Sequence, residues 1–438
     1  MSATSSSTYQ QDATDLVART ARAARSAQRS VVGARREVKD AGLHAMADHL
    51  VGSAREILVA NAADADRART SGMADGLIDR LTLTRRRIGA IADSLREIAG
   101  LPDPVGEIID GRTLPNGLRV RRVRVPVGVV GMIYEARPNV TVDTAALAVK
   151  SGNAIVLRGG SAAQDSNAAI VAALRSALEG QALPADLVTS VDAAGRDGAR
   201  ALMRAHGLVD ALVPRGGAGL IRTVVEQSTV PVIETGSGNC HVYVDASADL
   251  ETAVDIVVNA KTQRVGVCNA AETLLVHVDV AATYLPAAAR ALWDKDTVLH
   301  ADPTAHRILT EAATTAGRDD LLTQATEADW DTEYGSLDLA VRVVKSLEEA
   351  IDHIRAHTTG HTEAVLAQDV SVINDFIAGM DSAAVMVNAS TRFTDGGQLG
   401  LGAELGISTQ KLHARGPMGL SELTTTTWIV EGDGHIRP

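Results

Sequence analysis

Aromatic residues are scarce in this 438-residue chain, because Phe, Trp and Tyr together make up only 2% of it. Few side chains are therefore available to stack on the bases of a nucleic acid. An excess of positive charge is also missing, since the formal net charge is −12 and the sequence pI is near 5.5. That sign is wrong for a protein that neutralises phosphate backbones. Both shortages argue against a nucleic-acid partner.

Cysteine is nearly absent, since the chain contains only Cys240 and Cys268. Two cysteines exclude a disulfide framework and a Cys-rich metal site, and they suit a reducing compartment. No uninterrupted apolar run approaches the roughly 20 residues that a membrane-spanning helix needs. The first residues, MSATSSSTYQQDA, are polar. We therefore expect a cytoplasmic protein that does not enter a membrane.

The length and the ordinary balance of 45% hydrophobic and 22% charged residues predict two to three globular domains. The segment 15–75 is rich in Ala, Arg, Leu and Glu. It has apolar residues at helical spacing, for example Leu43, Met46, Leu50, Ala54 and Ile57. This pattern predicts two or three amphipathic helices, with the arginines on their solvated faces.

Residues 106–126 read as a β-hairpin, because Pro115-Asn116-Gly117 is a strong turn signal between two alternating segments. The second segment alternates arginine with aliphatic residues from 118 to 125. Two interpretations are open: a basic patch for nucleic acid, or a two-faced edge ribbon that contacts another subunit. The alternation favours the ribbon.

Between 127 and 233, short aliphatic runs alternate with segments of helix-forming composition. The runs are 127–133, 154–158, 187–192, 210–214 and 230–233. The helical segments between them are 141–150, 164–178, 198–205 and 219–227. This alternation predicts a parallel sheet with right-handed crossovers, as in doubly wound nucleotide-binding domains.

Two glycine-rich turns follow strands of this predicted sheet. They are Arg158-Gly159-Gly160-Ser161 and Arg215-Gly216-Gly217. Each leads towards a helix whose first N–H groups could hold a phosphate. Neither is the GxGxxG fingerprint, and a plain turn is the alternative interpretation of each.

A second α/β section begins after Gly238, and its most informative stretch is KTQRVGVCNAAE at 261–272. Cys268 follows the turn-like Arg264-Val265-Gly266 there. A thiol in this place is a candidate nucleophile, but a Cys beside apolar residues is also commonly buried and inert. Near the end of the chain, the glycine-dense segment 395–407 precedes SELTTTTWIV, whose β-branched residues predict a closing strand.

Several longer strings carry a resemblance to a known family. They include YEARPNVTVD, LRGGSA, PRGGAGLI, VIETGSGNCHVYVD, RVGVCNAAETLLVH, HTTGHTEAV and GLGAELGISTQKLHARGPMGL, which lie in this order between residues 134 and 420. The chain resembles the aldehyde dehydrogenase superfamily and, within it, the gamma-glutamyl phosphate reductase family. The resemblance implies an α/β aldehyde dehydrogenase-like fold and a dehydrogenase or reductase activity.

The resemblance implies three catalytic residues. Cys268 matches the nucleophile that forms a thioacyl enzyme, and Asn139 matches the Asn whose amide helps to hold the oxyanion. Glu234 falls near the general-base glutamate of the superfamily. A reductase must keep its thioester from water, so Glu234 could instead orient groups or relay a proton.

The resemblance also implies the ligands. The substrate would be L-glutamate 5-phosphate, whose anionic groups suit Arg137, Arg264, Lys411 and Arg415. Arg264 could alternatively pair with a surface acid. The cofactor would be NADPH, held by the two glycine-rich turns, with Arg158 placed where the superfamily has a basic residue near the adenosine ribose.

The implied domain organisation has three parts. Residues 1–105 and 127–236 would bind NADPH, residues 237–390 would carry the nucleophile, and residues 106–126 and 408–438 would form an oligomerisation ribbon with the closing strand. The ribbon predicts a homo-oligomer, and the reaction implies functional coupling to glutamate 5-kinase. His353, His357 and His361 resemble a metal cluster in spacing, but a helix-breaking Thr-Thr-Gly separates the last two and we expect no metal.

Two alternative functions remain open from the sequence. The protein could act on a different acyl phosphate or aldehyde within the same superfamily. It could also be a catalytically silent relative that binds nucleotide or other proteins as an assembly module. Substrate profiling separates the first alternative, and a turnover assay separates the second.

Overall fold

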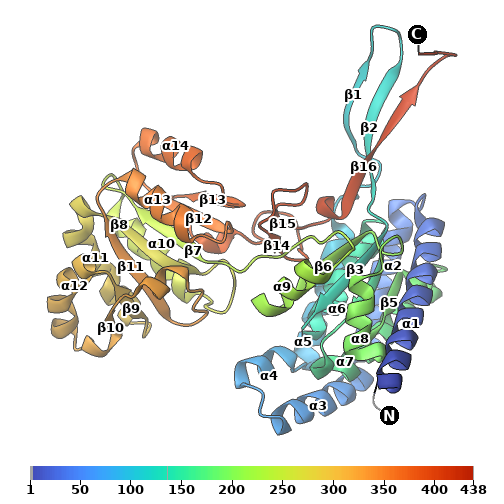
Figure 1. Cartoon of the computed structure of the whole chain (residues 1–438), viewed down its shortest axis with the longest axis horizontal. Coiled ribbons are helices and arrows are strands. Elements are labelled where there is room, and N and C mark those ends of the chain that lie inside the picture. Colours follow the sequence, from blue (N-terminus) through green and yellow to red (C-terminus); the bar gives the residue numbers. More distant parts are fainter. Residues whose placement is uncertain (1–2, 136, 438) are drawn as a thin grey trace. The chain divides into compact units, whose positions relative to one another are not determined.

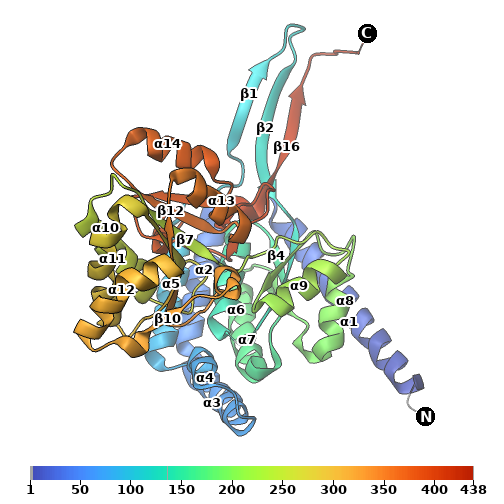
Figure 2. The ribbon, with the colours of Figure 1, turned by 60° about the vertical axis from the view of Figure 1, so that its left-hand side comes forward.

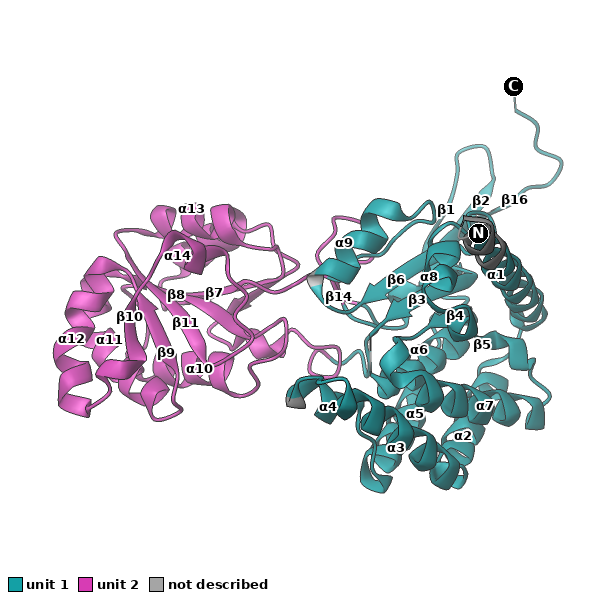
Figure 3. Ribbon diagram, turned by 60° about the horizontal axis from the view of Figure 1, so that its bottom comes forward, with its two compact units in different colours: residues 1–235, 400–406, 418–438 teal, residues 236–399, 407–417 magenta. Residues whose placement is uncertain are grey.

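The computed structural model describes residues 3–135 and 137–437 (Figure 1). These residues form two compact units, which Figure 3 shows in different colours. Unit 1 comprises residues 1–235, 400–406 and 418–438, and unit 2 comprises residues 236–399 and 407–417. None of the helices in the described residues is long and apolar enough to cross a membrane.

Unit 1 begins with a run of helices, as the composition of the first hundred residues predicts. They are α1 (Ala3–Val31), α2 (Arg36–Gly52), α3 (Ala54–Thr70), α4 (Asp75–Leu81) and α5 (Arg85–Gly100). The predicted apolar stripe from Leu43 to Ile57 is buried. It is shared between α2 and α3, because the chain turns at Ser53, which is the C-cap of α2 and the N-cap of α3.

A parallel sheet follows in unit 1, in the spatial order β5-β4-β3-β6. Its strands are β3 (Val129–Tyr134), β4 (Ala154–Arg158), β5 (Val188–Ser190) and β6 (Ala211–Arg215). The helices of this part are α6 (Pro138–Lys150), α7 (Gln164–Gly180), α8 (Gly195–Met203) and α9 (Ala218–Gln227). The doubly wound prediction is confirmed, and β3, the first strand of this sheet in chain order, lies between β4 and β6. The strand order reverses there, and such a switch point is where these sheets bind ligands.

One predicted strand of unit 1 is wrong. The apolar run 230–233 forms only an isolated bridge between Val232 and Leu212 of β6. Ile233 also donates its N–H to the Leu212 carbonyl at 2.9 Å. Hydrophobicity alone does not distinguish a strand from a short extended segment that covers the edge of a strand.

The predicted hairpin is present in unit 1. It consists of β1 (Ile108–Thr113) and β2 (Arg119–Pro126), and the closing strand β16 (Thr424–Glu431) pairs with the other edge of β2. Gly117 closes the turn with a φ of +93°, a conformation that glycine adopts without a steric penalty. Figures 1 and 2 show this ribbon standing away from the helices of unit 1.

The arginines of β2 pair with acids of the ribbon itself. Arg121 contacts Glu431 at 2.9 Å, and Arg124 contacts Glu107 at 2.8 Å. Arg122 lies 3.2 Å from an oxygen of Asp110. Their charges are neutralised within the ribbon, which supports a structural ribbon over a nucleic-acid patch.

Unit 2 is built on a seven-stranded parallel sheet in the order β10-β9-β11-β8-β7-β12-β13. The strands are β7 (Cys240–Val244), β8 (Ala271–His277), β9 (Val298–Ala301), β10 (Leu322–Gln324), β11 (Asp338–Val344), β12 (Thr362–Leu366) and β13 (Ala384–Val387). The helices are α10 (Leu250–Thr262), α11 (Val278–Trp293), α12 (Pro303–Ala316), α13 (Leu347–His357) and α14 (Val370–Gly379).

Alternation along the strands of unit 2 separates the helices into two layers. Val242 and Leu274 point to one face, where α10, α11 and α12 cover them. Tyr243 and Leu275 point to the other face, where they pack with Phe376 of α14 and with α13. Period-two alternation in a sheet with both faces buried produces this division.

A short antiparallel pair completes unit 2, formed by β14 (Ile407–Ser408) and β15 (Gly416–Pro417). It brackets a loop that carries Lys411 and Arg415. From the sequence, residues 408–438 are predicted to join the ribbon. In the structure, residues 407–417 belong to unit 2, and the chain returns to unit 1 only from residue 418.

Candidate active site

Cys268 lies in the loop between α10 and β8 of unit 2. Two other candidate side chains lie at the same end of the sheet, because Cys240 begins β7 and His361 directly precedes β12. The strands β8, β7 and β12 are neighbours, so their amino ends bring these three residues together. The loop before a strand, rather than the loop after it, therefore carries the candidate nucleophile.

The turn at 236–239 supports the Cys268 loop from behind. A Cβ atom on Gly238 would lie 1.4 Å from the Cys268 carbonyl oxygen, so only glycine lets the two backbones approach this closely. Asn239 fixes the turn, since its amide donates to the carbonyls of Trp330 at 2.7 Å and His357 at 2.9 Å. The string GSGNC is thus a platform for the Cys268 backbone.

His361 is a titratable partner of the Cys268 thiol. Its Nε2 lies 3.1 Å from Sγ. The imidazole is fully buried, and burial lowers the pKa of His361 to about 4. Cys268 itself is only half-buried. A neutral imidazole and a reachable thiol therefore face each other.

Cys240 behaves differently from Cys268 although it lies close by. Its thiol is fully buried, and burial, followed by the charge of Glu363, raises the pKa of Cys240 well above its usual range. The Cys240 thiol donates to the Cys268 carbonyl at 3.2 Å. It is a structural group of the platform, and only the thiolate form of a cysteine is nucleophilic.

Two arginines flank the Cys268 loop. Arg264, which the sequence predicts as a substrate ligand, is exposed in the loop itself. Arg392, in the 3-10 helix Thr391–Phe393, donates its Nε to Gln263 at 2.9 Å. Burial lowers the pKa of Arg392, and it interacts electrostatically with Arg264 and with Cys268. Arg392 could not be predicted from the sequence, because nothing in the string STRF at 390–393 distinguishes it from an ordinary surface arginine.

Lys411 and Arg415, the other predicted substrate ligands of unit 2, share one partner. Both contact Asp381, which lies just before β13. The amino end of β13 neighbours that of β12, which follows His361. The structure therefore brings a mixed charge cluster to the same edge of the sheet as Cys268.

In unit 1, Arg158 ends β4 at the carboxyl edge of the sheet. It donates to the Gly195 carbonyl at 3.3 Å. Burial lowers the pKa of Arg158, while Asp192 raises it and the nearby Arg196 lowers it again. Arg196, which lies at the start of α8, is not predicted from the sequence. Two guanidinium groups beside one strand end suit a phosphate group.

Gly159, the residue after Arg158, is held close to other chain segments. Its N–H donates to Asp192 at 2.6 Å, and a Cβ atom would lie 2.1 Å from the Asn167 amide nitrogen. Gly160 and Ser161 continue the turn into a short 3-10 helix (Ser161–Ala163). A side chain at 159 would overlap with Asn167, so the close packing of this turn requires a glycine here.

The second glycine-rich turn has a comparable geometry. A Cβ atom on Gly216 would lie 2.7 Å from the Glu135 carboxyl carbon, and Gly217 donates its N–H to Glu135 at 3.0 Å. Arg215, however, donates to the Leu405 carbonyl. This bond gives Arg215 a structural role at the glycine-dense segment. The placement of Gly216 and Gly217 at a cofactor phosphate stays a prediction.

The remaining predicted residues belong to unit 1. Arg137 is the N-cap of α6, and Asn139 lies in its first turn, where its amide is 3.4 Å from an oxygen of Asp143. Burial raises the pKa of Asp143 to about 6. Glu234 is half-buried just after the edge segment that covers β6. The roles of Asn139 and Glu234 stay predictions.

The three histidines with cluster-like spacing separate in the structure. His353 and His357 lie on α13, and their rings are 4.6 Å apart between centroids. His353 also packs edge-on against Trp330. His361 lies beyond the end of the helix and faces Cys268. Within residues 3–135 and 137–437, no group of three or more His, Cys, Asp or Glu is arranged to hold a metal ion.

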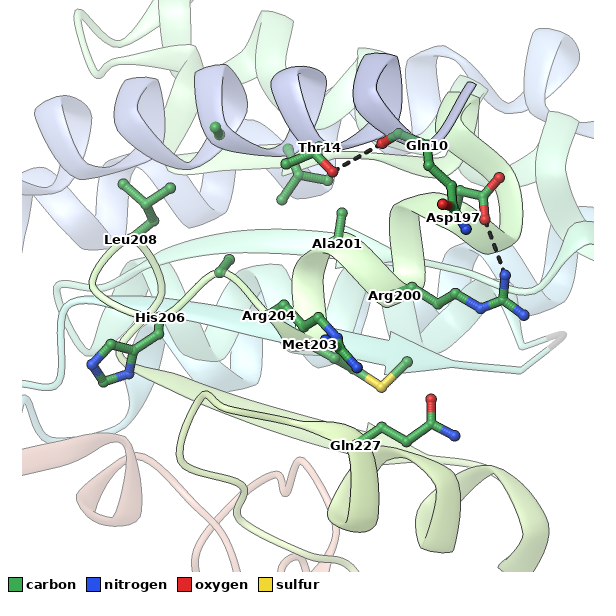
Figure 4. Close-up of a pocket in the computed structure, with 13 residues that line it drawn as sticks. Gln10, Thr14, Asp197, Arg200, Ala201, Met203, Arg204, His206, Leu208 and Gln227 are labelled. Atoms are coloured by element: carbon green, nitrogen blue, oxygen red, sulfur yellow. Dashed lines mark hydrogen bonds and ion pairs between the residues drawn. The ribbon is translucent and has the colours of Figure 1, made fainter. Parts of the chain in front are cut away.

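Unit 1 also contains a pocket of about 530 Å³ between α1 and α8 (Figure 4). Its polar lining includes Gln10, Thr14, Asp197 and Arg200, and Arg200 donates to Asp197 at 3.2 Å. The residues that line this pocket in the described chain include none of those predicted for the site. The pocket is therefore separate from the candidate active site.

Comparison with known proteins agrees with this geometry. Residues 2–307 match the model of the aldehyde dehydrogenase family. The chain is 60% identical to a gamma-glutamyl phosphate reductase of Kineococcus radiotolerans, over 95% of each chain. It is 55% identical to the one of Thermobifida fusca, over 96% of this chain and 98% of the relative.

A solved structure shows the same likeness. The crystal structure of gamma-glutamyl phosphate reductase from Thermotoga maritima superposes with a TM-score of 0.92 at 45% identity, covering 96% of this chain and all of that one. The family match and these relatives extend over most of the chain. The protein therefore belongs to the aldehyde dehydrogenase family and, within it, to the gamma-glutamyl phosphate reductases.

Proposed function

We propose that the protein reduces L-glutamate 5-phosphate to L-glutamate 5-semialdehyde and phosphate with NADPH, through a thioester on Cys268. This is the second step of proline biosynthesis from glutamate. The observation that carries the proposal is the half-buried Cys268 thiol on its glycine platform, in a chain 60% identical to a named gamma-glutamyl phosphate reductase.

The chemistry begins at Cys268. Its sulfur attacks the acyl carbon of the substrate, the bond to the phosphate oxygen breaks, and a thioester remains on the enzyme. NADPH, when bound, supplies the two electrons and the hydrogen that convert this thioester to the aldehyde. The Cys268 sulfur then leaves as the carbonyl re-forms.

The charged groups around Cys268 suit the substrate. Arg264 and Arg392 beside the loop would receive the acyl phosphate, because guanidinium groups match phosphate oxygens well. The cluster of Lys411, Arg415 and Asp381 has both signs of charge. It would suit the carboxylate and the ammonium at the amino-acid end of the substrate.

The cofactor residues are proposed from unit 1. Gly159, Gly160 and Ser161 would hold the adenosine side of NADPH, and Gly216 and Gly217 would lie at its phosphates. Arg158 and Arg196 together would bind a 2′-phosphate, which favours NADPH over NADH.

Some parts of the proposal rest on the family resemblance. Asn139 would donate to the oxyanion, Arg137 would bind the substrate, and Glu234 would orient groups or relay a proton. We also propose a cytoplasmic homo-oligomer that is functionally coupled to glutamate 5-kinase, whose product is the substrate here.

The reverse reaction tests this proposal. Glutamate semialdehyde should reduce NADP only when phosphate or arsenate is present, because the thioester needs phosphate as its acceptor. A hydrolytic aldehyde dehydrogenase would use water, and a coenzyme A-dependent one would need a thiol. Cys268→Ala should abolish turnover, whereas Cys240→Ala should retain most of it. Full turnover in phosphate-free buffer would contradict the reductase assignment.

A further inference from the structure

His361 is placed to act on the Cys268 proton. Its Nε2 is 3.1 Å from Sγ, which is close for a contact between sulfur and nitrogen. The imidazole is inaccessible to solvent, while the thiol is half-buried. The catalytic roles assigned above to Cys268, Asn139 and Glu234 leave this contact unexplained.

The tautomer of His361 is set by a second contact. Its Nδ1 lies 2.8 Å from Thr362 Oγ1, and Thr362 in turn donates its hydroxyl proton to Thr394 Oγ1 at 2.9 Å. A hydroxyl has only one proton to donate. Thr362 can therefore only accept from the Nδ1–H of His361. This arrangement leaves the lone pair of Nε2 directed at the Cys268 thiol.

Cys240 does not compete for this role. Its Sγ is 3.8 Å from His361 Nδ1, on the side where Thr362 is nearer, and its proton is donated to the Cys268 carbonyl. The hydrogen bonds thus run in one direction, from Cys268 through His361 and Thr362 to Thr394. All four residues belong to unit 2.

We propose that His361 is a catalytic base that accepts the Cys268 proton as the sulfur attacks, with Thr362 as the positioning residue that fixes its tautomer. The inference deepens the proposed function and rests on Cys268 being the nucleophile. The arrangement follows the general logic of a nucleophile, a base and a third group that orients the base.

The proton balance is simple. When Sγ bonds to the acyl carbon, its proton passes to Nε2. It then passes to the departing phosphate, so that hydrogen phosphate leaves and the imidazole is neutral again. When the thioester has been reduced and the aldehyde leaves, the freed thiolate takes one proton from solvent through Nε2. One proton is consumed per turnover, which matches the reduction of an acyl phosphate.

The low pKa of His361, about 4, supports a base that rests in its neutral form. Charged groups from several other elements act on the two thiols, Cys268 and Cys240. Arg392 favours a thiolate at Cys268, whereas the carboxylates Glu272, Glu333 and Glu363 oppose one at the neighbouring Cys240. The neutral imidazole is therefore available to accept the Cys268 proton as the sulfur attacks.

Alkylation of Cys268 by iodoacetamide tests the pair without substrate or cofactor. The rate is measured from pH 5 to 9 by mass spectrometry of the Cys268 peptide. In the wild type, the rate should change little between about pH 5 and 7, because the base is available above the His361 pKa of about 4. In His361→Gln the rate should fall about tenfold per pH unit below the usual thiol pKa of about 8.5.

Turnover should respond in parallel. Loss of a positioned base typically reduces kcat by about 10²- to 10⁴-fold, so we expect His361→Gln to lose at least about 10². Thr362→Val keeps the shape but cannot accept from Nδ1, and it should lose about tenfold in both assays. His353→Gln is the matched control, because His353 is a buried histidine of unit 2 whose pKa is lowered to about 3 and whose Nδ1 lies 3.2 Å from a guanidinium nitrogen of Arg342. Its alkylation profile should equal that of the wild type.

The variants test the role of His361 separately from the role of Cys268. An alkylation profile of His361→Gln that equals that of the wild type overturns the assignment of His361, and Cys268→Ala can still be inactive in that case. A fully active Cys268→Ala enzyme overturns the thioester route and the base together. If His361→Gln does not fold, a wild-type profile in the isosteric Thr362→Val variant overturns the orienting contact on which the inference depends.

Discussion

Replacing Gly238 with alanine tests whether the turn at 236–239 sets the position of the nucleophile. The added Cβ would lie 1.4 Å from the Cys268 carbonyl oxygen and 2.4 Å from its carbonyl carbon. Non-bonded Cβ contacts essentially never fall below 3.0 Å, so the Cys268 backbone has to move by about 1.6 Å or the turn has to shift by the same amount. Both contacts are with backbone, so no flexible side chain can absorb the change.

A displacement of that size has a predictable consequence. A misplacement of about 1 Å at a catalytic group can cost about 100-fold, so Gly238→Ala should lose at least about 100-fold in kcat. The overpacking should also destabilise the fold by about 1–3 kcal/mol. Steady-state turnover and urea unfolding measure the two effects. Gly89→Ala in α5, where a Cβ meets nothing within 4 Å, is the control. Wild-type kcat in Gly238→Ala would refute the platform interpretation.

Three further predictions concern the cofactor, the ion pair at the base of the Cys268 loop, and assembly. Arg158→Ala should raise the KM for NADPH much more than that for NADH, and an equal change in both would make Arg158 structural. Lys261→Met should lower the free energy of unfolding by about 3–5 kcal/mol, because it leaves Glu272 buried without its ion-pair partner; urea unfolding measures this, and Lys261→Met/Glu272→Leu should recover most of the loss. Val430→Lys on the exposed ribbon should shift the protein to monomers in light scattering, while a fully active wild-type monomer at assay concentration would contradict the predicted homo-oligomer.

The sequence predicted the sheet of unit 1 well, because the signals there are local. Strand β4 coincides with the predicted run at 154–158, and α7 and α9 begin within a residue of their predicted starts. The Asn-Gly turn fixed the hairpin for the same reason, since positive φ at Gly117 is a local property. The prediction of a strand at 230–233 was wrong because the conformation of this segment depends on the edge of β6 beside it, which composition does not reveal.

The candidate site was less predictable, because it is assembled across distant segments. Cys268 could be singled out by its surroundings, whereas His361 looked like the last member of a helical histidine series. Its role became visible only when the order β8-β7-β12 placed the starts of β8 and β12 on one edge. Arg392 and Arg196 could not be predicted for the same reason. Each lies far in the sequence from the residue beside which the fold places it. Thr-Thr-Gly at 358–360 was the one available signal that His361 leaves α13.

The buried pair of Lys261 and Glu272 holds the backbone of the Cys268 loop in place while the thiol of Cys268 stays accessible. Lys261 lies in the last turn of α10 and Glu272 lies in β8, so their contact closes the base of the loop that carries the nucleophile. Both side chains are fully buried, and burying a charged pair rarely adds net stability compared with apolar residues. A pair that stabilises little is better understood as a constraint on geometry. Together with Gly238 behind the loop and Asn269, whose amide donates to the Thr394 carbonyl at 2.9 Å, it fixes the backbone on both sides of Cys268. The thiol side chain is then left as the part of this loop that faces the base and remains accessible to substrate.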